Sequence, residues 1–329
     1  MLDIFSKDQT TMKKILFAVF CALTFSAATQ AEECKWPCKP ITIIIPNAPG
    51  SASDVAARRI GESIKSKLNV EYRLDYANGA NGIVGTRKLL DSKPDGYTVM
   101  LSRAAIDVYN PVMKKNLPYD TLNDFTDIGV TFKFPMTIIT SRTGKYQTYE
   151  SLKHPLSNKG LNGGSSTHGG ILLLKRFAKS NNIYIEAIPY NSPDASRNNL
   201  LGNHLDLMVE TVFPAIKFHR QDQIKILAVA AKERLHALPD VPTLAELGFP
   251  VEQWGFLSLR GPKGMPKDIT DQLNDVLNHA MKERAYQAML MSDGMFTPVN
   301  NRPGDLTKLI RKEIEFWDNV RQSENIARD

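Results

Sequence analysis

The sequence lacks the local signatures of the common enzyme classes. Its 329 residues contain no G-x-S-x-G motif, the segment that seats the nucleophile of many hydrolases. The glycine-rich segment 79–87 fits neither G-x-x-x-x-G-K-(S/T) nor G-x-G-x-x-G, which argues against a nucleotide site. The six histidines include no H-E-x-x-H motif and no pair spaced by four residues, which argues against a catalytic metal. We therefore expect no enzymatic activity, no cofactor and no metal.

One stretch keeps a secreted hydrolase as a remote alternative. Residues 165–170 read SSTHGG and are similar to the His-Gly-Gly segment of esterase oxyanion holes. The usual seat of the nucleophile is missing from the rest of the chain, so His168 is more simply explained as a hydrogen-bonding residue at a helix start. Binding is favoured over catalysis.

Long apolar runs are also scarce. Lys13 and Lys14 precede the run ILFAVFCALTFSAA, and small residues up to Ala31 suit a signal peptidase. No later segment approaches the roughly 18 apolar residues of a membrane-spanning helix. We predict that residues 1–31 are a signal peptide, with a short upstream extension if Met12 is the true start. The mature protein is then expected in the periplasm.

Cysteine is rare, with three in the chain. Cys21 follows Phe20, where a lipoprotein signal requires a small residue, so we reject a lipid anchor. Cys34 and Cys38 follow the predicted cleavage point, and an oxidising compartment permits a disulfide between them. Pro37 supplies the turn that so short a loop needs. We predict a small terminal disulfide loop with no catalytic role.

The net charge of +6 is modest and dispersed. Lysines and arginines alternate with acidic residues rather than forming the basic stripe of a nucleic-acid-binding protein. We therefore expect no nucleic acid partner and a mild preference for small anionic ligands.

Strand and helix patterns alternate along the mature chain. Residues 40–46, PITIIIP, are nearly all apolar, as in a strand buried on both faces. Apolar residues spaced by four predict an amphipathic helix over 53–68. Further strands are expected at 70–76, 96–102, 134–141, 183–190, 204–210, 224–231 and 254–262, and helices at 269–291 and 306–319. This alternation predicts parallel α/β sheets in two lobes.

A loop of small residues opens a helix twice, at residues 46–54 and again at 161–170. Unpaired N–H groups and the partial positive charge at a helix start favour an anion, and small residues let it approach the backbone. Two such helix starts would hold a ligand with two anionic ends. Asp54 competes for the same positive field, so we expect it to cap the helix or order a water.

These motifs together resemble the periplasmic solute-binding proteins of tripartite tricarboxylate transporters, the Bug or TctC-like family. The resemblance covers essentially the whole mature chain. It rests on an ordered set of segments: IIIPNAPGSASDVAAR, NGANGIVG, KPDGYTVML, YNPVMKKNLPYDTLNDF, GGSSTHGG, IPYNSPDASRNNLLGNHLDLM, ALPDVPTLAELG and GPKGMP. Each segment alone is weak evidence, but their order and separations match the family.

The resemblance implies an α/β, two-domain periplasmic-binding-protein fold of type II-like topology, with a ligand cleft between lobes joined by two crossing strands. Residues 32–136 with 257–329 would form domain 1, and residues 137–256 domain 2. The crossings are expected near FPMTIITS and VEQWGFLSL. The lobes are expected to close on the ligand.

The resemblance also implies the ligand and partners. The ligand is a small mono-, di- or tricarboxylate, including aromatic acids, and the partners are membrane transporter subunits of a monomeric binding protein. A periplasmic sensor that presents its loaded form to a receptor is the alternative. The expected ligand-binding residues are Asn47, Ala48, Ser51, Ala52, Ser53, Asp54, Asn81, Gly82, Ser102, Arg103, Ala104, Ser165, Ser166, Thr167, His168, Tyr190 and Glu210.

Three departures from the family pattern concern the ligand rather than the fold. Ser51 and Ala52 replace a glycine pair, and Tyr76-Ala77 replaces Asn-Arg. Arg103 stands where a small hydroxyl residue is common. Its guanidinium either pairs bidentately with a carboxylate or points to solvent, and the sequence favours neither.

Overall fold

The computed structural model describes residues 35–156, 160–297 and 301–328. The predicted signal peptide and Cys34, one half of the predicted disulfide, lie outside these residues. Residues 35–38 belong to a separate unit from the compact one that begins at Lys39, and the description below concerns the second unit. Within the described residues, no helix combines the length and apolarity needed to cross a membrane.

The first sheet, sheet A, begins with the strand β1 (Ile41–Ile45), which pairs in parallel with β2 (Tyr72–Tyr76) and β3 (Thr98–Arg103). All four isoleucines of β1 are fully buried, as its unbroken apolar pattern predicts. The antiparallel strand β9 (Trp254–Pro262) and the first part of β4 (Phe125–Ser141) complete the sheet. Lobe A denotes the part of the molecule built on this sheet.

The second sheet, sheet B, repeats the parallel arrangement. Strand β5 (Leu161–Ser165) lies between β6 (Ile185–Pro189) and β7 (Leu207–Thr211) and runs parallel to both. The last part of β4 pairs antiparallel with β7 and with β8 (Ile224–Val229). Lobe B denotes the part built on this sheet.

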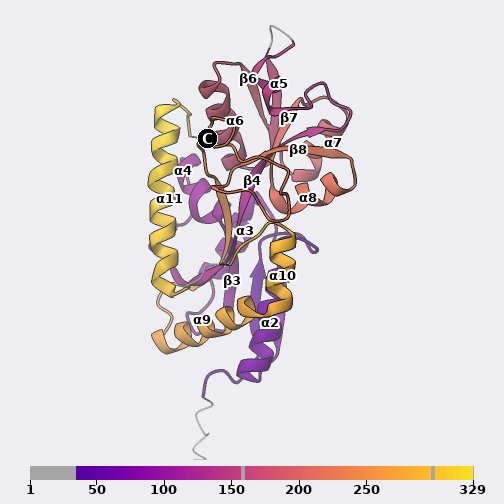
Figure 1. Ribbon diagram of the computed structural model, residues 1–329. Helices are drawn as coiled ribbons and strands as arrows, with labels where there is room; N and C mark the ends of the chain where they lie inside the picture. The colour runs from indigo at the N-terminus through magenta and orange to yellow at the C-terminus, as the bar shows by residue number, and fades with distance from the viewer. Residues whose placement is uncertain (1–34, 157–159, 298–300, 329) are drawn as a thin grey trace, which may run out of the picture. The chain divides into compact units, whose positions relative to one another are not determined.

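Two chain segments cross between the sheets side by side. Pro135 of β4 pairs with Trp254 in sheet A, whereas the next residue, Met136, pairs with Thr211 in sheet B. The N–H of Gln253 donates to the carbonyl of Ala230, and its carbonyl accepts from the N–H of Met136. The expected fold, two α/β lobes joined by two crossing strands, is thus confirmed (Figure 1).

The sequence pattern underestimates the length of β4. It predicts an extended segment over 134–141, but the strand begins at Phe125 and pairs with β9, a segment far away in the chain. The exact domain boundaries, 136/137 and 256/257, stay a proposal. The register shows that β9 already pairs with sheet A at Trp254.

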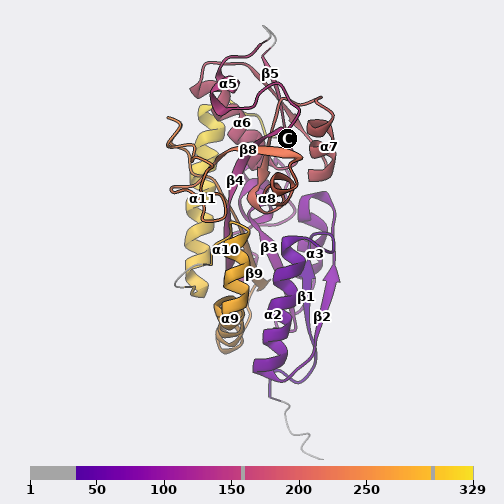
Figure 2. The same cartoon turned by 45° about the vertical axis from the view of Figure 1, so that its right-hand side comes forward.

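Helices cover the sheets, and α11 packs along β4 (Figure 2). The expected helix over 269–291 is interrupted at Glu283, whose backbone is extended. The helices are α2 (Ala52–Leu68), α3 (Ile83–Leu90), α4 (Asn110–Met113), α5 (Tyr149–Lys153), α6 (His168–Ser180), α7 (Pro193–Leu201), α8 (Val212–Arg220), α9 (Lys267–Lys282), α10 (Arg284–Ser292) and α11 (Pro303–Ser323), with the short turns η1 (Ala80–Gly82) and η2 (Ala105–Tyr109).

One apolar cluster joins the lobes. Leu172 of α6, in lobe B, packs in the same buried cluster as Tyr109 of η2 and Trp317 of α11. The Tyr109 and Trp317 rings meet edge to face with centroids 5.6 Å apart. Burial of these large side chains stabilises the contact between α6 and lobe A.

The strand registers place the carboxyl ends of both parallel sets beside the crossing segments. The last residue of β3, Arg103, lies opposite Leu257 near the beginning of β9, and the last residue of β7, Thr211, lies opposite Met136. In open α/β sheets, ligands bind outside the carboxyl ends of the strands. The two carboxyl edges are therefore where a shared ligand site is expected.

Candidate functional site

The first loop of the candidate site leads from β1 into α2. Ser51 caps the helix, since its hydroxyl accepts from the N–H of Asp54 at 3.3 Å. The N–H groups of Ala52 and Ser53 precede the first intrahelical bond and have no acceptor within the helix. The Ser53 hydroxyl accepts from the side-chain amide of Asn47 at 3.1 Å, so Ser53 braces the loop rather than capping the helix.

Asp54 is a brace for the same loop. The residue is 5% exposed, and its carboxylate accepts from the Gly50 N–H at 2.8 Å and from the Tyr76 hydroxyl at 2.7 Å. Arg58, one turn along α2, reaches it at 2.9 Å. Burial opposes ionisation, but these three partners together hold the pKa of Asp54 below its usual value. The expectation of a cap or a water-ordering residue is thus replaced by direct bonds, because Tyr76 from β2 reaches the carboxylate.

Replacing Asp54 with asparagine should destabilise the fold in a pH-dependent way. A depressed carboxyl pKa contributes stability above the unfolded value of about 3.9, and this contribution disappears as pH falls through the folded value. At pH 7 we expect the free energy of unfolding of Asp54→Asn, measured in urea, to be about 1–3 kcal/mol lower than that of the wild type. Below about pH 4 the difference should shrink. The exposed Asp240→Asn variant is the control, and an equal, pH-independent loss in both would contradict this role.

The second loop carries an unusual backbone. Four successive residues, Gly79, Ala80, Asn81 and Gly82, have φ values of 138°, 45°, 54° and 94°. A non-glycine residue in the left-handed region costs about 1–2 kcal/mol, and such residues persist where their surroundings hold them. Gly82 also lies against η2, where a Cβ would approach within 2.5 Å of the Ile106 side chain.

Arg103 ends β3 beside this loop. Its guanidinium donates to the side-chain oxygen of Asn81 at 3.2 Å, while its buried Nε–H has no acceptor in the part of the chain that the structure describes. Among the described residues, no carboxylate lies within ion-pair distance of it. Burial lowers the pKa of Arg103 to about 10, so the group stays charged at neutral pH without a counter-ion. An anionic ligand would supply that counter-ion.

In lobe B the corresponding loop leads from β5 into α6. Thr167 caps the helix, because its hydroxyl accepts from the N–H of Gly170 at 3.0 Å. Ser165 is 1% exposed and donates to the Val209 carbonyl, so its hydroxyl is used inside the lobe. Ser166 lies between these two residues, and His168 is the first residue of the helix.

The remaining expected ligand-binding residues differ in how exposed they are. Ser102 is fully buried and donates to Asp107, and Ala104 is 5% exposed. Glu210 is 4% exposed and forms a buried ion pair with Arg197, which suits a positioning role. Tyr190 is partly buried just after β6, and Ala48 is exposed in the first loop.

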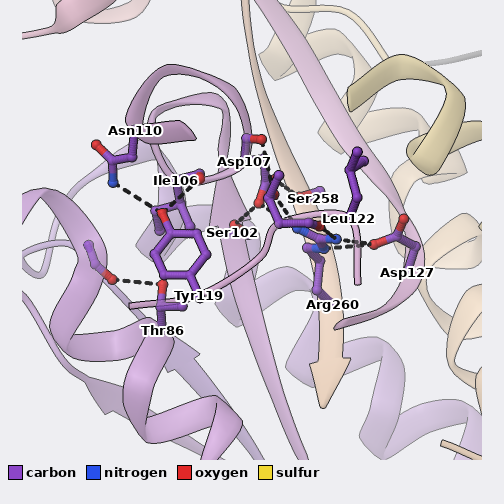
Figure 3. Close-up of polar contacts among 12 residues, drawn as sticks. Thr86, Ser102, Ile106, Asp107, Asn110, Tyr119, Leu122, Asp127, Ser258 and Arg260 are labelled. Atoms are coloured by element: carbon purple, nitrogen blue, oxygen red, sulfur yellow. Dashed lines mark hydrogen bonds and ion pairs between the residues drawn. The ribbon is translucent and has the colours of Figure 1, made fainter. Parts of the chain in front are cut away.

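A buried polar network stands behind this edge of sheet A. The Asp107 carboxylate accepts from Ser102 at 2.7 Å, from Ser258 at 2.8 Å and from Arg260 at 2.9 Å (Figure 3). Arg260 also pairs with Asp127 of β4. The network ties η2 and β3 to β9 and β4, the two strands that lead to the crossing, and so holds the Arg103 end of β3 rigidly.

A cavity of about 270 Å³ lies elsewhere, between the crossing strands and α11. Its lining residues are Lys133, Trp254, Phe256, Phe296, Thr297, Leu309 and Glu313. None of the expected ligand-binding residues lines it, so the candidate site rests on the hydrogen bonds and strand ends described above.

Sequence patterns miss the roles of three polar residues that support the candidate site. Tyr76 holds Asp54, Asn110 holds Asn81, and the fully buried Gln253 donates to the Tyr109 hydroxyl at 3.2 Å. Asn110 falls within the segment YNPVMKKNLPYDTLNDF, whose resemblance to the family was a usable signal. The others have partners too distant in the chain for any local pattern to link.

The fold and the paired helix starts define a two-lobe periplasmic binding protein. The chain belongs to the TctC family, the tripartite tricarboxylate transporter family receptors, whose model matches residues 56–326. Protein BugT from Bordetella pertussis is 27% identical to it over 316 residues, which cover 93% of this chain and 95% of BugT. The expected family is thus confirmed.

Solved structures agree in fold. The periplasmic binding protein BugD, at 25% identity, covers 89% of this chain with its whole length and a TM-score of 0.80. Rpa4515 of R. palustris with adipate, at 23% identity, gives a TM-score of 0.81 over 89% of this chain and all of its own. MatC from Rhodopseudomonas palustris with bound malate, at 22% identity, gives 0.78 over 87% and 99%.

Proposed function

We propose that the protein captures a small carboxylate-bearing solute in the periplasm and delivers it to the membrane subunits of a tripartite tricarboxylate transporter. It performs no catalysis in this role. The predicted signal peptide supports the periplasmic location, and the family supports the transporter partnership. We expect one chain to suffice, since both helix starts belong to it.

Arg103 carries the proposal for the ligand. It is a partly buried cation at the carboxyl edge of sheet A. Within residues 35–156, 160–297 and 301–328 it makes a hydrogen bond to a neutral amide and leaves its Nε–H unused. A carboxylate would accept two parallel hydrogen bonds from such a guanidinium. This arrangement favours pairing with an anion over the alternative in which Arg103 simply points to solvent.

The beginning of α6 is proposed to hold the other end of the ligand. Its first-turn N–H groups and the nearby Ser166 hydroxyl offer donors to an anion. Thr167 is engaged as the cap, so we assign it the role of shaping this helix start. The Ala52 and Ser53 N–H groups of α2 are the third set of donors proposed to face the ligand.

Thermal unfolding tests the proposed ligand class. Protein stripped of co-purified small molecules is heated with a panel of mono-, di- and tricarboxylates, each paired with its amide. An acid present at 100 times its dissociation constant should add about 2.7 kcal/mol of stability, a shift of several degrees. The matching amides should have no effect, and the acid should be recovered unchanged. A panel in which no acid raises the melting temperature, or in which the acid is consumed, would contradict the proposal.

Uptake separates delivery from sensing. In cells that produce the transporter, uptake of the labelled acid that stabilises the protein should stop when this protein is absent and return when it is supplied. Uptake that continues unchanged without the protein would favour the sensor alternative.

A further inference from the structure

We propose that Asn110, assisted by Tyr119, is a positioning residue that aims the Arg103 guanidinium at the ligand. The inference rests on the proposed role of Arg103 in carboxylate binding. Neither residue is expected to touch the ligand, because Asn110 is fully buried and Tyr119 is 7% exposed. They act through the second loop.

Asn110 holds Asn81 at two points. Its side-chain oxygen accepts from the Asn81 side-chain amide at 2.8 Å, and its own amide nitrogen donates to the Asn81 backbone carbonyl at 3.3 Å. Asn81 makes both bonds from a left-handed backbone, with φ at 54°. Thr86 adds a third restraint on the loop by donating to the Gly82 carbonyl at 2.9 Å (Figure 3).

Donor and acceptor chemistry gives this chain of bonds a direction. The single proton of the Tyr119 hydroxyl goes to the Ile106 carbonyl at 2.8 Å, so the hydroxyl accepts from the Asn110 amide at 3.2 Å (Figure 3). That contact fixes which way the Asn110 amide faces, and its oxygen therefore faces the Asn81 amide nitrogen. The Asn81 oxygen is left for Arg103.

The position of Arg103 thus depends on residues that never meet it. Among the described residues, the Asn81 oxygen is the acceptor recorded for its guanidinium. With the Asn110 amide removed, Asn81 would lose both restraints, and its strained backbone would relax toward ordinary φ values. The guanidinium would then sample several rotamers, and ligand binding would be weakened by the entropy cost of ordering it.

Asn110→Ala tests this series of hydrogen bonds, with Asn274→Ala as the matched control. Asn274 is another buried asparagine, 7% exposed, that donates to two backbone carbonyls in a different region, those of Ile128 and Asn301. Tyr119→Phe is the milder second variant, which keeps the ring and removes the hydroxyl. It keeps the test valid if Asn110→Ala does not fold.

The first readout is the Nε–H signal of Arg103 in nitrogen-15 NMR of the ligand-free protein, assigned by its loss in Arg103→Lys. In Asn110→Ala and Tyr119→Phe it should move toward the signals of exposed arginines, and in Asn274→Ala it should stay unchanged. If the Arg103 signal of Asn110→Ala is the same as that of the wild type, the inference is overturned. If only Tyr119→Phe folds, an unchanged signal in that variant overturns it.

The second readout is affinity for adipate and for malate, measured by calorimetry. Asn110→Ala should bind the preferred acid about tenfold more weakly, as expected for about 1.4 kcal/mol, and Asn274→Ala should bind it like the wild type. A tenfold loss in both variants would show a general structural effect and overturn the inference. If the wild type binds neither these acids nor any other in the panel, the proposed function fails, while the Arg103 signal still decides whether Asn110 positions the guanidinium.

Discussion

Arg103→Met is expected to weaken carboxylate binding strongly while leaving the fold intact. The variant removes the cation that pairs with the ligand, a loss of about 2–5 kcal/mol for a desolvated charge pair, or at least about a thirtyfold weaker affinity. Methionine is unbranched and shorter than arginine, so it occupies the space of the aliphatic stem without adding a charge. Because burial lowers the pKa of Arg103 to about 10, the unpaired charge destabilises the empty protein. The melting temperature of empty Arg103→Met should therefore equal or exceed that of the wild type.

Two variants control this experiment. Arg87→Met changes the net charge by the same amount at an exposed position on α3 and should bind like the wild type. Arg103→Lys keeps the charge but loses the planar pair of donors, so its affinity should lie between those of the wild type and Arg103→Met. Undiminished binding by Arg103→Met would place the ligand away from the end of β3.

Gly169→Ala should separate α6 from lobe A. A Cβ at this position would lie 2.6 Å from Cζ of Tyr109 and 2.7 Å from the amide nitrogen of Gln253, both of which are buried. These side chains cannot move without disturbing the crossing segment and the Tyr109–Trp317 contact. Overpacking of this kind typically costs about 1–3 kcal/mol. We expect lower stability, a larger radius of gyration in small-angle scattering with ligand present, and weaker binding.

Gly304→Ala is the matched control for this substitution. Gly304 also lies in the first turn of a helix, α11, but a Cβ there would meet no atom within 4 Å. The control should therefore behave like the wild type in scattering and affinity. Equal results for the two variants would mean that ligand binding does not require the close approach of α6 to η2.

Local patterns in the sequence were sufficient to predict strands made almost entirely of apolar residues and helices that begin with small polar residues. The strand PITIIIP and the helix starts at SASD and STHGG belong to this class, because their signals lie within a few neighbouring residues. The interruption at Glu283 had no such signal, since neither proline nor glycine occurs in residues 276–290.

The side-chain contacts of the candidate site could not be predicted in this way. Asp54 is bound by Tyr76, Asn81 by Asn110, and Asp107 by Arg260, and the last pair is 153 residues apart in the chain. Each contact exists only because β1, β2, β3 and β9 are adjacent in one sheet. The sequence also left Arg103 undecided, because its lack of an acidic partner among the described residues depends on the assembled sheet edge.

Mass spectrometry of the small molecules released on denaturation tests the central claim most directly. The protein is purified from the periplasm without added ligand, denatured, and its extract compared with that of Arg103→Met prepared in parallel. We predict that the wild type releases an organic acid in an amount comparable to the protein and that the variant releases little or none. Release of a neutral or cationic molecule by the wild type, or of the same acid in equal amount by Arg103→Met, would contradict a carboxylate site built around Arg103.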